Sequence, residues 1–310
     1  MKVLCFGSLN IDYVYQVPRF VSRGETLAAS SLQTFSGGKG MNQSIALARA
    51  GMDVCHAGAV GEDGAFLVDE LTAAGVDARY VARLHDRRTG HAIIQKGADG
   101  DNCILLYGGA NQAVTREQID RTLAGFSAGD ALVAQNEISG LNYLLERAKA
   151  RKLRLALNPS PMGDGLAALF PIVDYLLLNE IEASQLLGCG ADCGAEMMLR
   201  QLAERFPRAE IVLTLGKDGS AYAGRGKRFY QSAARTGAVD TTAAGDTYTG
   251  YFLAGILTGR DPLWAMRYAT AAAAIAVSRP GAAPSIPTRG EVLAFLKKLE
   301  KSDAEFGKAQ

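Results

Sequence analysis

Short, mostly apolar segments alternate with helical stretches along the chain, and this alternation restricts the fold more than any other feature. Segments that are apolar on both faces must be covered on both faces, and crossover helices provide that cover in parallel sheets. The predicted strands are Val3–Phe6, Val54–Val60, Ala131–Gln135, Leu153–Leu157, Tyr175–Leu178 and Ile211–Leu215. The predicted helices are Asn42–Ala50, Ala65–Ala74, Leu141–Ala150, Glu180–Leu187, Ala195–Arg205, Asp246–Thr258 and Pro262–Val277. The sequence therefore predicts an α/β fold, a doubly wound, mainly parallel sheet flanked by helices.

Two segments interrupt this alternation. Tyr13–Phe35 is too long for a simple loop and has no helical periodicity, and Thr89–Gly108 has the pattern of a hairpin around a turn at Gly97–Asn102. We expect both, from about 12–36 and 89–108, to form a small β lid at the carboxyl edge of the sheet, where open α/β sheets bind ligands. No Pro/Ser-rich linker separates them, so we expect a single domain over 1–310.

Charge and hydropathy exclude several classes of protein. Lys and Arg total 33 and Asp and Glu total 32, which leaves no basic excess for a nucleic-acid partner. The longest nearly apolar run, Tyr268–Ser278, is far shorter than the roughly 20 residues that span a bilayer. The first residues lack the apolar region and cleavage site of a signal peptide, and the five cysteines have no disulfide or zinc pattern. We expect a soluble, cytoplasmic protein that binds neither membranes nor nucleic acid.

The strongest candidate for a chemical site is the segment Val239–Thr247. Tyr248, Phe252 and Ile256 follow it at intervals of four, so a helix begins near Gly245. Small residues at a helix N-terminus leave backbone N–H groups open to an anion, and the helix dipole favours negative charge there.

Asp246 is placed where it could accept a proton from a hydroxyl that attacks a phosphoryl group. A simpler interpretation is equally consistent with this segment alone. In that interpretation Thr241 or Thr242 caps the helix and Asp246 complements the helix dipole.

A second candidate is the glycine-rich segment Ser36–Gln43, which leads into a helix. Glycine lets the backbone approach a ligand closely, although such a turn can also be purely structural. The chain contains no G-x-x-x-x-G-K-[ST] motif and no G-x-G-x-x-G after a strand, so it has neither a Walker A site nor a dinucleotide fingerprint.

Three further polar groups directly follow predicted strands. Asn10 and Asp12 are two residues apart and so face the same side of an extended backbone, where they could hold adjacent hydroxyls or form an Asx turn. Asn179 and Glu182 suit a ligand site or a simple helix cap, and Thr214–Gly219 could be an ordinary tight turn.

Taken together, these motifs resemble the ribokinase (PfkB) family of sugar kinases. Asn-x-Asp, Gly-Gly-Lys-Gly-x-Asn-Gln, Asn-x-x-Glu, Thr-Leu-Gly-x-x-Gly and Asp-Thr-Thr-Ala-Ala-Gly-Asp-Thr occur in the family's order, from Lys2 to about Leu296. Within the family, Met41–Gln43, Gly109–Asn111 and Pro284–Pro287 fit the subgroup that acts on ribose. Met41 departs from the usual Ala and Thr270 from the usual Asn. The resemblance implies an ATP-dependent kinase that phosphorylates the 5-hydroxyl of D-ribose.

The resemblance also implies roles for single residues. Asp246 would be the general base, and Ala243, Ala244 and Gly245 would form an anion hole for the transferring phosphoryl group. The sugar would be held by Asn10, Asp12, Gly38, Lys39, Gly40, Asn42, Glu137 and Asp246. The nucleotide would meet Asn179, Thr214, Leu215, Gly216, Lys217, Gly219, Gly245 and Thr270.

Metal ions and a second protomer are implied in the same way. Glu182 would organise Mg²⁺, and an activating K⁺ would lie among Asp240, Thr242, Ala276, Arg279, Gly281 and Ser285. Apolar lid residues such as Val14, Ile93 and Leu105 predict a homodimer that buries the lid faces.

Other functions are left open at this point. Family members with nearly the same motifs act on fructose, 2-keto-3-deoxygluconate or nucleosides, and a few pocket side chains decide between such substrates. A non-catalytic sugar- or nucleotide-binding protein is a further alternative, although a binder needs no base. An NAD-dependent oxidoreductase is disfavoured by the missing fingerprint.

Overall fold

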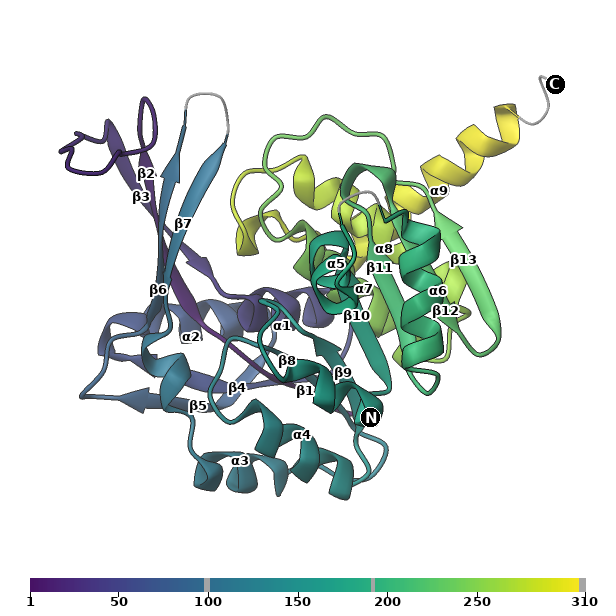
Figure 1. Ribbon diagram of the computed structural model, residues 1–310, viewed down its shortest axis with the longest axis horizontal. Coiled ribbons are helices and arrows are strands. Elements are labelled where there is room, and N and C mark those ends of the chain that lie inside the picture. The colour runs from purple at the N-terminus through teal and green to yellow at the C-terminus, as the bar shows by residue number, and fades with distance from the viewer. Residues whose placement is uncertain (98–100, 191–192, 307–310) are drawn as a thin grey trace.

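The computed structural model describes residues 1–97, 101–190 and 193–306, and in them nine strands form one sheet through the centre of the molecule (Figure 1). In sheet order the strands are β13 (Lys227–Gln231), β12 (Ser220–Gly224), β11 (Glu210–Thr214), β10 (Tyr175–Asn179), β9 (Arg154–Asn158), β8 (Ala131–Gln135), β1 (Val3–Phe6), β4 (Val54–Gly61) and β5 (Asp77–Leu84). The seven strands from β11 to β5 pair in parallel, whereas β12 and β13 add an antiparallel edge. All seven parallel strands therefore end at one edge of the sheet.

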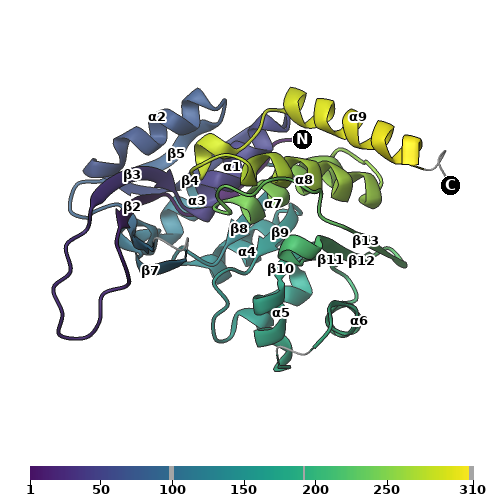
Figure 2. The same cartoon turned by 90° about the horizontal axis from the view of Figure 1, so that it is seen from above.

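Helices cover both faces of this sheet (Figure 2). One layer holds α1 (Lys39–Arg49), α2 (Ala65–Ala73), α7 (Ala244–Leu257), α8 (Pro262–Val277) and α9 (Arg289–Phe306). The other holds α3 (Arg116–Leu123), α4 (Leu141–Ala150), α5 (Glu180–Leu187) and α6 (Ala195–Arg205). Short 3₁₀ turns lie at Glu62–Gly64, Gly109–Ala113, Leu166–Ile172, Gly216–Asp218 and Ala283–Ser285.

The apolar strands have two buried faces because alternate side chains belong to different cores. On β1, Val3 and Cys5 pack under the α1/α7/α8 layer, whereas Leu4 and Phe6 pack under the α3–α6 layer. The same division along the other parallel strands explains why their sequences are apolar throughout. The predicted α/β fold is confirmed.

A second, smaller sheet projects from the molecule at the upper left of Figure 1. Its strands are β3 (Ser31–Gly37), β2 (Asn10–Gln16), β6 (Gly90–Lys96) and β7 (Asn102–Tyr107), in that order. The predicted hairpin pairs Ile93 with Leu105, although part of its turn, 98–100, lies outside the described residues. The sheet is mixed rather than antiparallel throughout, because β2 and β6 run parallel.

Several elements differ from the prediction. Helix α1 begins at Lys39, three residues before the predicted start, so Lys39 and Gly40 belong to its first turn. Strands β5, β12 and β13 were not predicted. β5 and β13 mix exposed and half-buried residues without a continuous apolar run, and β12 is a short edge strand. Among the described helices, none is both long and apolar enough to cross a membrane.

Candidate active site

Asp246 lies in the first turn of α7, and both of its carboxylate oxygens are held by amides from α1. Asn42 Nδ2 donates to Oδ2 over 3.0 Å, and Gln43 Nε2 donates to Oδ1 over 2.9 Å. Burial raises the pKa of Asp246, and the charge of Lys39 and the two amide bonds offset this only in part. The result is a fixed carboxylate with a greater affinity for protons than a free aspartate has.

The start of α7 offers open backbone donors beside this carboxylate. Ala243 is left-handed, with φ of 59°, and its carbonyl accepts the Thr247 N–H over 2.8 Å. The N–H groups of Gly245 and Asp246 have no partner in the part of the chain that the structure describes. A Cβ built on Gly245 meets nothing within 4 Å, so open space lies in front of these donors.

This geometry corrects two expectations. The Ala244 N–H donates to the Thr241 carbonyl over 3.2 Å, so it does not belong to the free donors of the predicted anion hole. The capping interpretation is also wrong, because the N-cap position is Ala243 and no side chain caps this helix. Thr242 instead donates to Asp240 through its N–H and its hydroxyl.

Gln43 is the centre of a buried network that sequence reasoning did not single out. Its Nε2 also donates to Asn158 Oδ1 over 3.0 Å, and its Oε1 accepts from Gln135 Nε2 over 2.6 Å. Asn158 in turn donates to the Leu177 carbonyl over 3.0 Å. The sequence carried one signal for this role, since Asn158 ends a parallel strand as Asn179 does.

Two glycines of the turn before α1 are required for close backbone contact. Gly38 has φ of 94°, and a Cβ there would lie 2.9 Å from the Asn10 nitrogen. A Cβ on Gly40 would lie 2.5 Å from the Gly7 carbonyl carbon. These contacts bring the first turn of α1 against the end of β1 and the start of β2.

Lys39 lies among the predicted sugar-side carboxylates. Glu137 accepts hydrogen bonds from the Ser8 hydroxyl and, over 3.3 Å, from the Lys39 N–H. Burial opposes the charge of Lys39, but Asp246, Glu137, Glu182 and Asp12 together raise its pKa. Lys39 is therefore held in its charged form by four nearby carboxylates.

Asn10 and Asp12 face this cluster from the small sheet. The Asn10 amide oxygen accepts from Asn111 Nδ2 over 2.8 Å, which fixes its orientation. Burial raises the pKa of Asp12 to about 7, with further contributions from Glu137 and Asp246. A Cβ on Gly37 would lie 2.1 Å from Asp12 Oδ2, so the glycine makes room for this carboxylate.

A cavity of about 180 Å³ extends from Asp246 across the carboxyl ends of the parallel strands. The cavity lies between the predicted catalytic and sugar-side residues Asp246 and Lys39 and the predicted nucleotide-side residues Asn179 and Thr214. Its lining comprises Lys39, Asn158, Ser160, Leu177, Leu178, Asn179, Glu182, Thr214, Ala243, Gly245, Asp246 and Thr249. The turn Leu215–Gly219 follows β11 and does not line this cavity. Thr270, on α8, does not line it either, and its buried hydroxyl has no partner among the described residues.

Asn179 and Glu182 both cap α5 and line the cavity. Asn179 Oδ1 accepts the Glu182 N–H over 2.8 Å, and Glu182 Oε2 accepts the Asn179 N–H over 3.0 Å. The predicted helix cap is therefore confirmed. The second carboxylate oxygen of Glu182 has no hydrogen-bond partner among the described residues, and Glu182 lines the cavity, which suits a Mg²⁺ ion or one of its water ligands.

Hydrogen bonds link Asp240, Thr242 and Gly281 among the predicted K⁺ residues. Asp240 Oδ1 accepts from Thr242 N over 2.9 Å, and its Oδ2 accepts from Gly281 N over 3.1 Å. Arg279 bonds through its N–H to Ala276 and through its guanidinium to Glu291, and Ser285 donates to Ala282. No group of three His, Cys, Asp or Glu side chains suited to a metal occurs within the described residues.

Comparisons with known proteins agree with this geometry. The model of the pfkB family of carbohydrate kinases matches residues 1–289. Ribokinase of Haemophilus influenzae is 34% identical over 296 residues, covering 94% of this chain and 97% of that protein. Arabidopsis thaliana ribokinase complexed with ribose and ATP superposes with a TM-score of 0.85 at 31% identity, covering 96% of this chain and 98% of that one. Cryptococcus neoformans ribokinase in complex with ADP gives 0.83 at 34% identity, covering 94% and 99%.

Proposed function

The chain belongs to the pfkB family of carbohydrate kinases, and from this membership we propose that it is a ribokinase, which transfers the γ-phosphoryl group of ATP to the 5-hydroxyl of D-ribose. The observation that carries this proposal is the pairing of Asp246 with the open donors at the start of α7. A carboxylate held by Asn42 and Gln43 lies beside two free N–H groups, in one cavity with Asn179 and Glu182.

Asp246 acts as the general base in this proposal. Its raised pKa lets it take the proton of the sugar hydroxyl as the oxygen attacks phosphorus. Asn42 and Gln43 keep both carboxylate oxygens in place, so little reorganisation is needed at the moment of transfer.

The N–H groups of Gly245 and Asp246, together with the ammonium of Lys39, offset charge on the transferring phosphoryl group. Asn179, Glu182 and Thr214 form the nucleotide side of the cavity. Mg²⁺ bound near Glu182 would neutralise phosphate charge.

The sugar lies on the other side of Asp246. Asn10 and Asp12 from β2, and Lys39, Asn42 and Glu137 from the main body, present acceptors and donors to adjacent hydroxyls. Gly38 and Gly40 let the first turn of α1 pack against Gly7–Asn10, which holds Lys39 beside Asn10 and Asp12.

The small sheet is the proposed lid of a single kinase domain. It carries Asn10 and Asp12 on β2, next to the cavity, while its far end extends away from the main sheet (Figure 1). Closure over the sugar would exclude water, which competes as a phosphoryl acceptor.

An activating K⁺ is proposed near Asp240. Its carboxylate orders Thr242 and Gly281, so backbone carbonyls of this loop are held close to the start of α7. Initial rates in K⁺ should exceed those in Na⁺ at equal ionic strength, and equal rates would remove this ion from the proposal.

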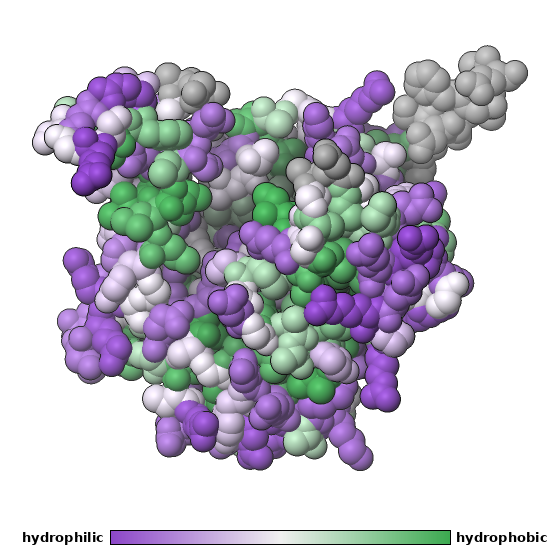
Figure 3. All heavy atoms as spheres, viewed as in Figure 1, coloured by the Kyte–Doolittle hydropathy of each residue, from purple (hydrophilic) through white to green (hydrophobic). Residues whose placement is uncertain are grey.

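A homodimer through the lid is proposed from its exposed apolar side chains. All six residues of β7 are exposed, and Leu105 is 67% exposed. Figure 3 shows apolar residues gathered over this part of the molecule. The cytoplasm is the proposed location, because the reaction consumes ATP.

The function is tested by ADP release with ATP, Mg²⁺ and K⁺ against ribose, fructose, 2-keto-3-deoxygluconate and adenosine. Ribose is expected to give the highest kcat/KM. Preference for another member of the panel would overturn the ribose assignment and keep the kinase reaction. Sugar binding in calorimetry without turnover of any acceptor would instead favour a binding protein.

A further inference from the structure

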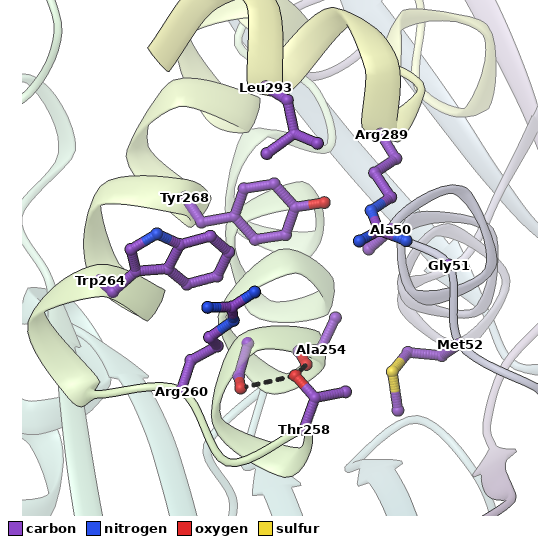
Figure 4. Close-up of a pocket in the computed structure, with 11 residues that line it drawn as sticks. Ala50, Gly51, Met52, Ala254, Thr258, Arg260, Trp264, Tyr268, Arg289 and Leu293 are labelled. Atoms are coloured by element: carbon purple, nitrogen blue, oxygen red, sulfur yellow. Dashed lines mark hydrogen bonds between the residues drawn. The ribbon is translucent and has the colours of Figure 1, made fainter. Parts of the chain in front are cut away.

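A second cavity, of about 370 Å³, lies at the opposite ends of the two helices that carry the catalytic residues (Figure 4). It is lined by Ala50, Gly51, Met52, Ala254, Gly255, Thr258, Arg260, Trp264, Tyr268, Arg289 and Leu293. None of these residues lines the cavity at Asp246. At 1.5 Å per residue, the paths along α1 from Lys39 to Ala50 and along α7 from Asp246 to Thr258 are each about 17 Å long. The cavity is therefore separate from the kinase site.

Two guanidinium groups enter this cavity without an anionic partner. Arg260 and Arg289 make no side-chain hydrogen bond or ion pair with any residue that the structure describes. Arg49 is different, because its guanidinium donates to the carbonyls of Ala283 and Ile286. The two free cations are therefore not used to cap nearby helix ends.

Neighbouring acids do not neutralise the pair either. Asp261 caps α8, since its Oδ1 accepts the Leu263 N–H over 2.9 Å. Glu291 is held by the Arg279 guanidinium over 2.6 Å. Two like charges that face one cavity repel each other, and an anion bound between them would replace this repulsion with attraction to both.

The wall between these cations is aromatic. The rings of Trp264 and Tyr268 lie 4.9 Å apart at 32°, and the Arg260 guanidinium lies 4.9 Å from the centre of the Trp264 ring. The Tyr268 hydroxyl is buried and has no hydrogen-bond partner among the described residues. In Figure 4 this hydroxyl points to the side of the cavity where Arg289 enters. Such a wall accepts a flat apolar group and offers one further donor to an oxyanion.

We propose that this cavity is a regulatory site for a small oxyanion carried on a flat ring. The carboxylate or phosphate would lie between Arg260 and Arg289, and the ring would pack against Trp264. The volume is within the usual range for small-molecule sites, about 300 to 1,000 Å³. The class of ligand follows from the two free guanidinium groups and the aromatic wall together.

The packing of α1 against α7 gives this site a route to the chemistry. A Cβ on Gly250 would lie 2.4 Å from the Ala46 Cβ, so the two helices are in close contact midway between the cavities. A ligand that shifts one helix end against the other also shifts Lys39 relative to Asp246. This regulatory half of the proposal rests on the proposed kinase function, whereas the binding half does not.

Binding can be measured without any enzymatic activity, because Trp264 is the single tryptophan of the chain. Titration with phenyl phosphate, without sugar or ATP, should change its fluorescence saturably. The double variant Arg260→Gln/Arg289→Gln should bind at least tenfold more weakly, because each charge-assisted hydrogen bond contributes about a factor of ten or more. Asp246→Asn should bind as the wild type does. A linear response, or equal affinity in wild type and double variant, would overturn the site.

A matched control removes the same charge elsewhere. Arg121 and Arg154 are exposed and lie outside the cavity, and Arg121→Gln/Arg154→Gln should retain wild-type affinity. Loss of binding in this control would show that net charge, not the cavity, attracts the anion.

Two further probes separate the parts of the ligand. Benzoate should bind if a carboxylate suffices, and absence of benzoate binding would restrict the site to phosphates. Inorganic phosphate should bind more weakly than phenyl phosphate. Equal affinities would show that the aromatic ring of the ligand contributes nothing to binding.

The regulatory half is tested by kinetics. Saturating phenyl phosphate should change the sugar KM or kcat at least twofold in the wild type and leave Arg260→Gln/Arg289→Gln unchanged. Saturable fluorescence without a kinetic effect would overturn regulation and leave the binding site. An enzyme inactive on every sugar counts against the proposed function, and the fluorescence result still decides the site.

Discussion

The amide nitrogen of Gln43 lies 2.9 Å from Oδ1 of Asp246, although the two residues are 203 positions apart in the sequence. This hydrogen bond joins the second turn of α1 to the first turn of α7. Asn42 makes the parallel contact to the other carboxylate oxygen. The carboxylate proposed as the general base is thus positioned by the packing of two helices rather than by its own loop.

Asp246→Asn should leave sugar affinity nearly unchanged and lower kcat by at least about a hundredfold, the usual contribution of a general base. The substitution keeps the size of the side chain but cannot accept the hydroxyl proton. Turnover and calorimetric sugar binding measure the two quantities separately. A kcat close to the wild-type value would remove Asp246 from the mechanism.

Gly245→Ala should lower kcat/KM and leave the protein at least as stable as the wild type. A Cβ at this position meets no protein atom within 4 Å, so it fills the space proposed for phosphate oxygens. Ala also favours a helix by about 0.5–1 kcal/mol over Gly. Thermal unfolding and steady-state kinetics check this pair of effects, and unchanged kinetics would show that the space is not used.

Gln43→Leu should move the acidic limb of the kcat–pH profile to higher pH. The lost hydrogen bond had stabilised the charged form of Asp246, so the pKa of that carboxyl rises further. The unpaired Gln135 and Asn158 amides should also lower the free energy of unfolding by about 1–3 kcal/mol.

A matched control for Gln43 is Gln118→Leu. Gln118 is also buried and donates to the Gly58 carbonyl over 2.7 Å, away from the cavity at Asp246. It should lose comparable stability while the pH profile stays in place. A shift in both variants would assign the effect on Gln43 to general destabilisation.

Sugar KM should rise as pH falls below about 7, because the pKa of Asp12 is raised to about 7 and only its ionised form accepts two hydroxyl hydrogen bonds. Asp12→Asn should have a higher KM at pH 8 and lose most of this dependence. A KM for the wild type that is constant between pH 6 and 8 would contradict the role of Asp12.

The same raised pKa predicts how the free energy of unfolding depends on pH. Folding raises the pKa of Asp12 from 3.8 to about 7, so the folded state retains a proton that the unfolded chain loses between these values. The contribution of Asp12 to stability therefore falls as pH rises from about 4 to 7. Asp12→Asn should unfold at a higher temperature than the wild type at pH 8, and the difference should shrink toward pH 4.

Leu105→Asp should convert the proposed dimer into a monomer, since it places a charge on an exposed apolar strand. Sedimentation velocity of both proteins checks this, with Lys227→Asp on β13 as a control outside the lid. A wild-type protein that sediments as a monomer would refute the dimer.

The sequence predicted the elements of the main sheet because local and tertiary signals agree there. Helix α5 begins where Asn179 and Glu182 form a capping box, and α4 begins after the left-handed Gly140. Strands β12 and β13 were missed because an antiparallel edge needs neither a crossover helix nor an apolar run.

The candidate site was predictable only where residues follow strands or glycine turns. Asn179 and Asp246 carry such local signals. The roles of Gln43, Gln135 and Ser8 depend on contacts between distant segments, such as the Ser8 hydroxyl with Glu137, 129 positions away. No spacing in the sequence encodes these contacts.

Strand β3 ends at Gly37 and α1 begins at Lys39, so Gly38 alone connects the small sheet to α1 on this side. From the pair Asn10–Gly37 to the pair Gln16–Ser31 the hairpin extends six residues, about 20 Å. The hairpin pairs with β6 along β2, so a rotation at Gly38, among the proposed sugar-side residues, would move the small sheet with it. A rotation of 10° at Gly38 displaces its tip by about 3.5 Å over that length. A dye attached near the tip would register events at Lys39 while remaining far from the chemistry.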